Sequence, residues 1–133
     1  MDKGSEAELL EAARAARSHA YAPYSHFAVG AAVRTGSGRV FTGVNVENAA
    51  YPAGICAERV AAAAAIAAGE RELVTCAVVG PNGKPCPPCG ICRQFLAEFN
   101  EQMTLLLEDG EGGMIRRTLS DLLPGSFGSS HLQ

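Results

Sequence analysis

The sequence has no hydrophobic run long enough to cross a lipid bilayer, and it has no block of basic residues. Its longest apolar run, residues 60–68, is far shorter than the roughly 20 residues that a membrane-spanning helix needs. A net charge of −3 without a basic cluster does not suggest nucleic-acid binding. The N-terminus is acidic and amphipathic, unlike a signal peptide. We therefore expect a cytoplasmic protein with neither a membrane nor a nucleic acid as partner.

The chain also lacks internal repeats and any recognisable linker between domains. Its 133 residues are 47% hydrophobic and 19% charged, which is typical of a globular protein that can bury a core. We expect a single domain over residues 1–133, in which residues 128–133 form a mobile tail.

Hydrophobic periodicity switches between helical and strand patterns along the chain. Ser5 and Glu8 form a capping-box pattern at the first helix, and Gly69 is placed to end the alanine-rich second helix. A Gly-Ser-Gly turn at residues 36–38 predicts a β-hairpin. The expected helices span residues 5–19, 57–68 and 90–99, with a short turn at 121–123, and the expected strands span 27–35, 39–46, 73–80, 104–108 and 114–118.

Five cysteines in such a chain favour metal binding in a reducing compartment over a disulfide framework. Cys89 and Cys92 have the two-residue spacing that lets both sulfur atoms reach one ion, and Cys56 opens another helix. A helix N-terminus favours thiolate over thiol. These three cysteines therefore predict a zinc site that keeps one coordination position open for water. We expect Cys76, inside an apolar strand, to be a buried structural thiol.

Glu58 follows Cys56 by two residues, in the first turn of the predicted helix. A carboxylate there can reach a metal-bound water without being a ligand. Three thiolates on a divalent ion leave a net negative charge, which Arg59 is well placed to offset. A Cys-x-Glu that opens one helix and a Pro-Cys-x-x-Cys that opens another are together typical of zinc deaminases.

Asn45 and Glu47 end the second expected strand, where alternation puts both on the same face. A paired amide and carboxylate can bind the hydroxyls of a ribose. The alternative is a strand end capped by amide groups, and this is our interpretation of Asn48. We interpret the aromatic residues and His26 of segment 21–26 as a packed surface loop.

These motifs, taken in order, resemble the small homotetrameric type of cytidine deaminase. The resemblance runs from about residue 21 to residue 127, which is most of the chain. Its landmarks are Pro23-Tyr24-Ser25-His26-Phe27, Gly43-Val44-Asn45-Val46-Glu47-Asn48-Ala49, Tyr51-Pro52, Gly54-Ile55-Cys56-Ala57-Glu58-Arg59, Pro88-Cys89-Gly90-Ile91-Cys92-Arg93-Gln94 and Leu122-Leu123-Pro124 with Phe127.

The resemblance implies a role for each matching residue. The zinc ligands would be Cys56, Cys89 and Cys92, with one ion per subunit, Glu58 as the proton shuttle and Arg59 as the compensating charge. Substrate contacts are implied as well: the ribose would be held by Asn45 and Glu47, the pyrimidine by Phe27 and the Ala57 backbone, and the pocket would be completed from neighbouring subunits by Tyr51 and Phe127.

The same resemblance implies a fold and a reaction. The fold would be a three-layer α/β/α sandwich around a five-stranded mixed sheet. The reaction would be hydrolytic deamination of cytidine and 2′-deoxycytidine to uridine and 2′-deoxyuridine, with release of ammonia, as part of pyrimidine salvage. The partners would be a small nucleoside and three further copies of the chain, with active sites shared between subunits.

Cys86 departs from the family pattern and keeps an alternative open. It is either a loop thiol without a role, which we favour, or a fourth ligand that closes the metal site. A four-cysteine zinc or iron–sulfur protein would leave Glu58 without a purpose. A third possibility keeps the chemistry with another substrate, as in antibiotic or nucleic-acid-editing deaminases, but the Asn45–Glu47 pair favours a free nucleoside.

Overall fold

The computed structural model describes residues 3–132, which fold around a five-stranded sheet. Short 3₁₀ segments lie at Arg17–His19, Tyr51–Ala53, Pro81–Gly83 and Ser129–Leu132. The helices are α1 (Lys3–Ala16), α2 (Ala57–Ala67), α3 (Gly90–Ala97) and α4 (Leu119–Leu122), and the strands are β1 (Gly30–Thr35), β2 (Val40–Val44), β3 (Leu73–Val79), β4 (Thr104–Glu108) and β5 (Met114–Thr118).

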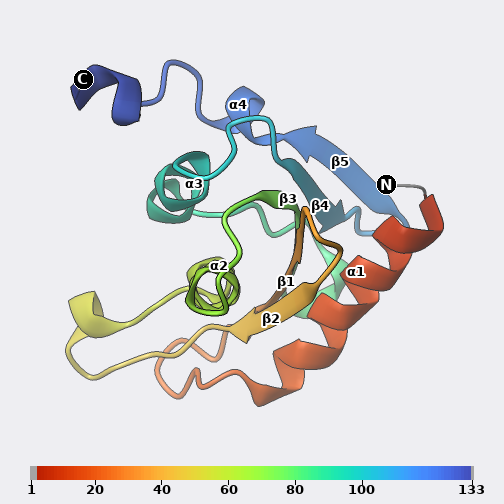
Figure 1. The fold of residues 1–133 in the computed structure, drawn as a ribbon. Coiled ribbons are helices and arrows are strands. Elements are labelled where there is room, and N and C mark those ends of the chain that lie inside the picture. The colour runs from red at the N-terminus through yellow and green to blue at the C-terminus, as the bar shows by residue number, and fades with distance from the viewer. Residues whose placement is uncertain (1–2, 133) are drawn as a thin grey trace.

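The sheet is mixed, with strand order β2-β1-β3-β4-β5. Only β3 and β4 pair in parallel, and the crossover between them carries α3. Helix α1 covers one face of the sheet, while α2 and α3 lie together on the other face (Figure 1). The predicted three-layer α/β/α sandwich around a five-stranded mixed sheet is therefore confirmed.

Two hydrophobic clusters fill the spaces between the layers, and alternation along the strands assigns each residue to one of them. Ala32, Ala77 and Leu106 point toward α1 and pack against its apolar stripe of Leu9, Leu10 and Ala13. The residues that alternate with them point toward α2 and α3, and they are Ala31, Val33, Cys76, Val78, Leu105 and Leu107. Cys76 is fully buried, as the sequence predicted.

Helix α2 packs unusually close to β2. A Cβ atom on Gly43 would lie 2.4 Å from the Ala61 nitrogen and 2.5 Å from the Ala57 oxygen. Only glycine on the strand, facing a helix made largely of alanine, permits this approach. The alanines also favour the helical conformation. The close packing fixes the N-terminal turn of α2, where Ala57 and Glu58 are buried.

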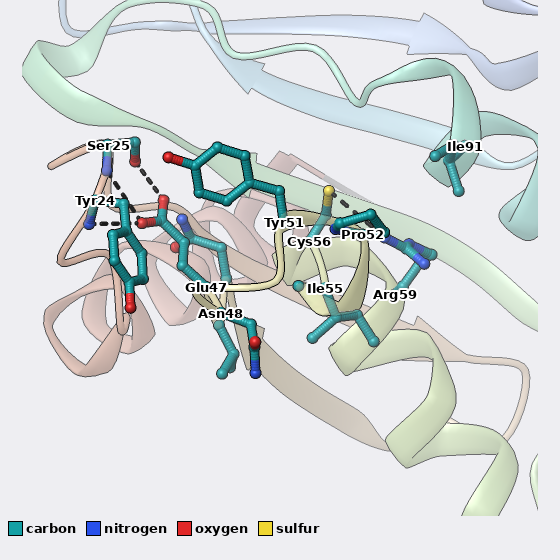
Figure 2. A pocket seen from close by; sticks show the side chains of 13 residues that line it. Tyr24, Ser25, Glu47, Asn48, Tyr51, Pro52, Ile55, Cys56, Arg59 and Ile91 are labelled. Carbon is teal, nitrogen blue, oxygen red and sulfur yellow. Dashed lines mark hydrogen bonds between the residues drawn. The ribbon is translucent and has the colours of Figure 1, made fainter.

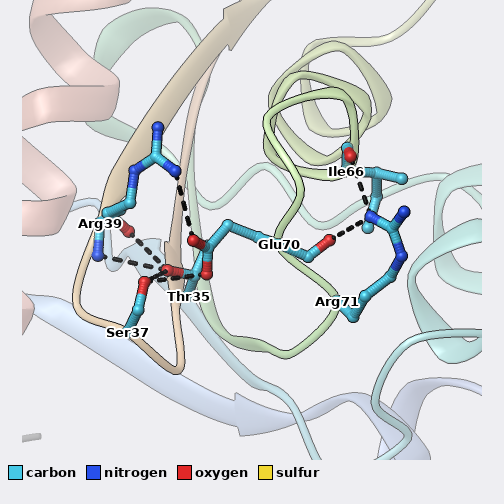
Figure 3. Close-up of polar contacts among 6 residues, drawn as sticks. All are labelled: Thr35, Ser37, Arg39, Ile66, Glu70 and Arg71. Carbon is cyan, nitrogen blue, oxygen red and sulfur yellow. Dashed lines mark hydrogen bonds and ion pairs between the residues drawn. The ribbon is translucent and has the colours of Figure 1, made fainter.

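The far end of α2 is tied to the β1–β2 turn by a polar cluster (Figure 3). Glu70 accepts a hydrogen bond from the Ser37 hydroxyl at 2.9 Å and pairs with Arg39 at 3.3 Å. Arg71 donates to the carbonyl oxygen of Ile66 at 2.9 Å. Gly69 adopts the left-handed conformation (φ +98°) that ends the helix, as predicted.

The structure shifts the bounds of several predicted elements. Helix α1 begins at Lys3, before the expected cap Ser5, and its last predicted residues form a 3₁₀ turn. Strand β1 begins at Gly30 rather than Phe27, and β2 ends at Val44 rather than Val46. The expected mobile tail, residues 128–133, contains the Ser129–Leu132 turn, while Gln133 lies outside the described residues. Within residues 3–132, no helix is long and apolar enough to span a membrane.

Candidate active site

Three sulfur atoms meet where α2 and α3 begin. Cys56 is the N-cap residue of α2, Cys89 is the N-cap residue of α3, and Cys92 is buried in the first turn of α3. Their Sγ atoms all lie within 4.8 Å of one another, and those of Cys56 and Cys89 are 3.7 Å apart. In a tetrahedral zinc site with Zn–S bonds of about 2.3 Å, sulfur atoms lie about 3.8 Å apart. The donor set therefore fits a single zinc ion.

The local electrostatics favour a thiolate at this cluster. A hydrogen bond from Cys92 and the bond and charge of Arg59 lower the pKa of Cys56 to about 5. Arg59 places Nη2 3.9 Å from the Cys56 sulfur. Burial opposes the charge on Arg59, but its bonds to Cys56 and Cys92 raise its pKa overall. The Arg59 guanidinium and the Cys56 thiolate thus keep each other charged, which suits metal binding.

Glu58 lies in the first turn of α2 and is only 4% exposed. Burial raises the pKa of its carboxyl group, and the negative charge at Cys56 raises it further. A buried carboxyl group with a raised pKa is suited to proton transfer. The predicted proton carrier and the three predicted ligands thus lie together at the N-termini of α2 and α3.

Cys86 is not part of the sulfur cluster. Among residues 3–132, the only group of cysteine, histidine or acidic side chains that could share an ion is Cys56, Cys89 and Cys92. Burial, followed by the negative charges of Glu58 and Cys56, raises the pKa of Cys86 to about 11. This thiol therefore lies near the cluster but stays protonated, and the closed four-cysteine alternative loses its structural basis.

A cavity of about 620 Å³ lies beside Cys56 and Arg59 and contains the predicted ribose-binding pair. Figure 2 shows Glu47 pointing toward the segment that carries Tyr24 and Ser25, with Tyr51 above it. Tyr51 is 78% exposed, and its ring meets that of Tyr24 edge-on at 6.2 Å. Asn45 and Glu47 both line this cavity, but they follow the last residue of β2 and Val46 between them lines it too, so strand alternation does not account for their placement.

Asn45 and Glu47 also hold the loop in front of β1, which sequence reasoning missed. Glu47 accepts hydrogen bonds from the backbone nitrogens of Tyr24 (3.0 Å) and Ser25 (3.1 Å) and from the Ser25 hydroxyl. These bonds lower the pKa of Glu47, and the bond from the Ser25 hydroxyl has the largest effect. Asn45 donates to the carbonyl oxygen of Phe27 at 2.8 Å. The loop at residues 21–26, interpreted from sequence as surface packing, therefore forms part of the site.

The remaining predicted contact residues lie in different places. Ala57 is fully buried at the first position of α2. Phe27 lines a second cavity together with Cys86. Phe127 does not line the cavity beside Glu47, because its carbonyl oxygen accepts a 2.8 Å hydrogen bond from Gln94 on α3 and its ring stacks on His131. Within one chain the two cavities are thus lined by Phe27, Asn45, Glu47 and Tyr51, whereas Phe127 lines neither.

Comparison with known families and structures explains this arrangement. A family model described as the cytidine and deoxycytidylate deaminase zinc-binding region matches residues 3–107. This chain belongs to that family. Membership confirms the prediction of a zinc-dependent enzyme of the cytidine deaminase family, and the sulfur cluster fits one zinc ion per subunit.

Individual members of the cytidine deaminase family match nearly the whole chain. The cytidine deaminase of Halalkalibacterium halodurans is 45% identical over 120 residues, which cover 90% of this chain and 91% of that one. That of Sporosarcina psychrophila is 41% identical over 126 residues, with coverages of 94% and 93%. The crystal structure of cytidine deaminase from Burkholderia pseudomallei has a TM-score of 0.86 at 45% identity and covers 96% of this chain and 100% of that one.

The geometry of the cysteines makes a prediction about metal content. We expect Cys89→Ser to lose most of its zinc, because one of three converging sulfur atoms is replaced by a harder hydroxyl ligand. Cys86→Ser is the matched control, and it should keep one zinc ion per subunit. Elemental analysis of the purified variants measures both. Zinc loss from Cys86→Ser would restore the four-cysteine alternative.

The Ser25–Glu47 contact makes a second prediction. Ser25→Ala should raise the pKa of Glu47, measured by NMR titration of its carboxyl carbon, because the hydroxyl bond is the largest cause of the lowered value. A lowered pKa stabilises the fold above the ordinary pKa of the group, and this contribution disappears as the pH falls through the lowered value. Both proteins should begin to lose this contribution as the pH falls below the ordinary pKa of the group, but the variant, whose folded-state pKa is higher, should lose a smaller amount and finish losing it at a higher pH.

Ser37→Ala provides a matched control, because the Ser37 hydroxyl is the largest cause of the lowered pKa of Glu70. This variant should raise the pKa of Glu70 and leave that of Glu47 unchanged. If Ser25→Ala left the Glu47 titration where it is in the wild type, the hydroxyl contact would have no part in setting the charge.

Proposed function

We propose that the enzyme hydrolyses cytidine and 2′-deoxycytidine to uridine and 2′-deoxyuridine, releasing ammonia, in pyrimidine salvage. The observation that carries this proposal is the buried Glu58 carboxyl group beside three converging cysteine sulfurs. A purely structural metal site has no use for a buried carboxyl group of raised pKa. Relatives named cytidine deaminase, which match this chain over most of its length, also support it.

Cys56, Cys89 and Cys92 would hold the zinc ion, which when bound acidifies a water molecule and so supplies the nucleophile. Glu58 accepts a proton from the attacking water and delivers it to N3 of the pyrimidine as the oxygen bonds to C4. It then carries the second proton from that oxygen to the exocyclic amine. The C4–N bond breaks, ammonia leaves, and the carbonyl group of the product remains.

Charge balance in this mechanism depends on Arg59. Three thiolates and a divalent cation carry a net charge of −1, and this charge works against the acidity of a bound water. The Arg59 guanidinium, 3.9 Å from the Cys56 sulfur, draws electron density from that thiolate. We propose that this contact restores part of the acidifying power that three thiolates remove.

The substrate would span the space between the two cavities. Asn45 and Glu47 are proposed to hold the sugar hydroxyls, because each still has hydrogen-bonding capacity after binding the loop. Phe27 would pack on the pyrimidine. The Ala57 backbone at the start of α2 would contact the edge of the base, since a helix N-terminus offers N–H groups without helical partners.

We propose that the single domain assembles as a cytoplasmic homotetramer whose subunits share active sites. Tyr51 and Phe127, which are 78% and 57% exposed, would complete pockets of neighbouring chains. Sedimentation velocity on the zinc-loaded protein measures the assembly. A fully active monomer would contradict the shared site.

Ammonia release tests the reaction directly, with cytidine, 2′-deoxycytidine, free cytosine and a cytosine-containing single strand as substrates. We expect turnover of the two nucleosides only, because the sugar-binding pair requires a sugar on the base and the chain has no basic cluster. Turnover of free cytosine at the same rate would remove the proposed role of Asn45 and Glu47.

Glu58→Gln is the matched control for chemistry. The amide has the same shape but cannot shuttle a proton, so kcat should fall by about 10²–10⁴-fold while the zinc content is unchanged. A Gln variant as active as the wild type would refute the proton-carrier role.

A further inference from the structure

Cys89 is the most exposed of the three cysteines that converge at the N-termini of α2 and α3. Cys92 is buried and Cys56 is partly buried, whereas Cys89 is exposed. Packing against neighbouring side chains therefore contributes little to holding the Cys89 sulfur. Its place among the three sulfur atoms depends instead on how firmly the backbone on either side of it is held.

The segment that leads into Cys89 has few hydrogen-bond donors of its own. Residues 84–88 form neither helix nor strand, and three of the four residues before Cys89 are proline, at positions 85, 87 and 88. Proline has no backbone N–H group with which such a segment could bind its surroundings. Pro88 is also fully buried, so its carbonyl oxygen needs a hydrogen-bond partner from elsewhere in the chain.

Arg93, in the first turn of α3, supplies that partner. Its Nε donates a hydrogen bond of 2.8 Å to the carbonyl oxygen of Pro88. Its backbone nitrogen donates to the carbonyl oxygen of Cys89 at 2.9 Å. One residue thus holds the peptide groups on both sides of the exposed cysteine.

The Arg93 guanidinium is itself fixed by a second element. Its Nη1 donates a hydrogen bond of 2.8 Å to the carbonyl oxygen of Leu122, the last residue of α4, which has no partner within that helix. Helix α4 lies beside α3, and the Leu122 side chain packs against the hydrophobic cluster that faces α2 and α3 (Figure 1). Because the guanidinium is planar and rigid, these two bonds brace the Pro88 carbonyl group against the core.

Arg93 and Arg59 therefore act on the metal centre in different ways. Arg59 approaches the Cys56 sulfur itself, at 3.9 Å. The Arg93 side chain binds backbone carbonyl oxygens, so it acts on the geometry of the ligand loop rather than on the charge of a sulfur atom. Lysine could not replace it, because a single ammonium group lacks the rigid fork that reaches both carbonyl groups.

We propose that Arg93 is a positioning residue of the metal centre: by bracing the Pro88 carbonyl group against Leu122, it fixes the Cys89 sulfur and so raises the affinity for zinc. The inference rests on the proposed function for the assignment of the three zinc ligands, and it is independent of the substrate that the enzyme deaminates.

Zinc affinity, measured by competition with a chelator of known affinity, tests this inference without turnover. Arg93→Met keeps most of the aliphatic stem but has no donor. We expect it to bind zinc roughly 10–100-fold more weakly than the wild type, which is the usual effect of removing a group that supports a metal ligand. Arg93→Lys keeps one donor group and should fall between the two, and it serves as the test if the Met variant does not fold.

Arg71 provides the matched control, because its Nη1 donates to the carbonyl oxygens of Ile66 (2.9 Å) and Glu70 (2.8 Å) at the far end of α2. Arg71→Met loses two bonds of the same kind and should keep the wild-type zinc affinity. The Tm of each zinc-loaded variant measures its general loss of stability. Equal losses of zinc affinity in the two Met variants would make the role of Arg93 merely structural and overturn the inference.

Cobalt substitution reports on Cys89 directly, because thiolate-to-cobalt charge-transfer absorption follows the number of sulfur atoms bound. Cys89→Ser loaded with excess Co²⁺ provides the spectrum of a site with two thiolates. The spectrum of Arg93→Met should shift from that of the wild type toward this reference, and that of Arg71→Met should not. A wild-type zinc affinity or an unchanged cobalt spectrum in folded Arg93→Met overturns the inference. A wild type that binds zinc but leaves cytidine intact contradicts the proposed reaction instead.

Discussion

The convergence of two helix N-termini on one small volume is the constraint on which the rest of the structure depends. Sulfur ligands of one metal ion must lie within about 4 Å of each other, yet Cys56 and Cys89 are 33 residues apart. The sheet resolves this by placing α2 and α3 side by side on one face. Gly43 then lets α2 rest directly on β2, so the position of Cys56 is set by backbone contacts rather than by flexible side chains.

That convergence concentrates negative charge, and this charge changes the protonation equilibria of the neighbouring residues. The first turn of α2 carries a ligand, a buried carboxyl group and a guanidinium in the space of four residues. Glu58 is destabilised as a carboxylate by burial and by the Cys56 charge, which is the condition for it to exchange a proton readily. The hydrogen bond from Cys92, followed by the contact with Arg59, lowers the pKa of Cys56 and so favours its thiolate at neutral pH. Ligand affinity and proton transfer therefore depend on the same four consecutive positions that follow Ile55.

Sequence reasoning predicted the metal cluster because ligand spacing and helix starts are local features. It placed the bounds of β4 and β5 correctly, since both have clear hydrophobic patterns between turns. It predicted that β1 begins at Phe27, whereas the strand begins at Gly30. The cause of this difference is a contact between distant segments, which no local pattern indicates. The Asn45 side chain accepts a hydrogen bond from the Val29 nitrogen and donates one to the Phe27 carbonyl oxygen. At residues 27–29 these side-chain bonds take the place of hydrogen bonds between strands. Such a contact, like that between Ser25 and Glu47, is visible only once distant segments are placed together.

The exposed aromatic residues bear on how the site works as a whole. The cavity beside Glu47 is bordered by Tyr24, Tyr51 and Ile91, of which Tyr51 and Ile91 are 78% and 65% exposed. Phe127, at 57%, is held away from the cavities of its own chain by Gln94. Apolar side chains gathered and exposed at the rim of a cavity are typical of a surface that another protein covers. Deamination requires a pocket that excludes bulk water, so an open rim on the isolated chain supports an active site completed by its neighbours.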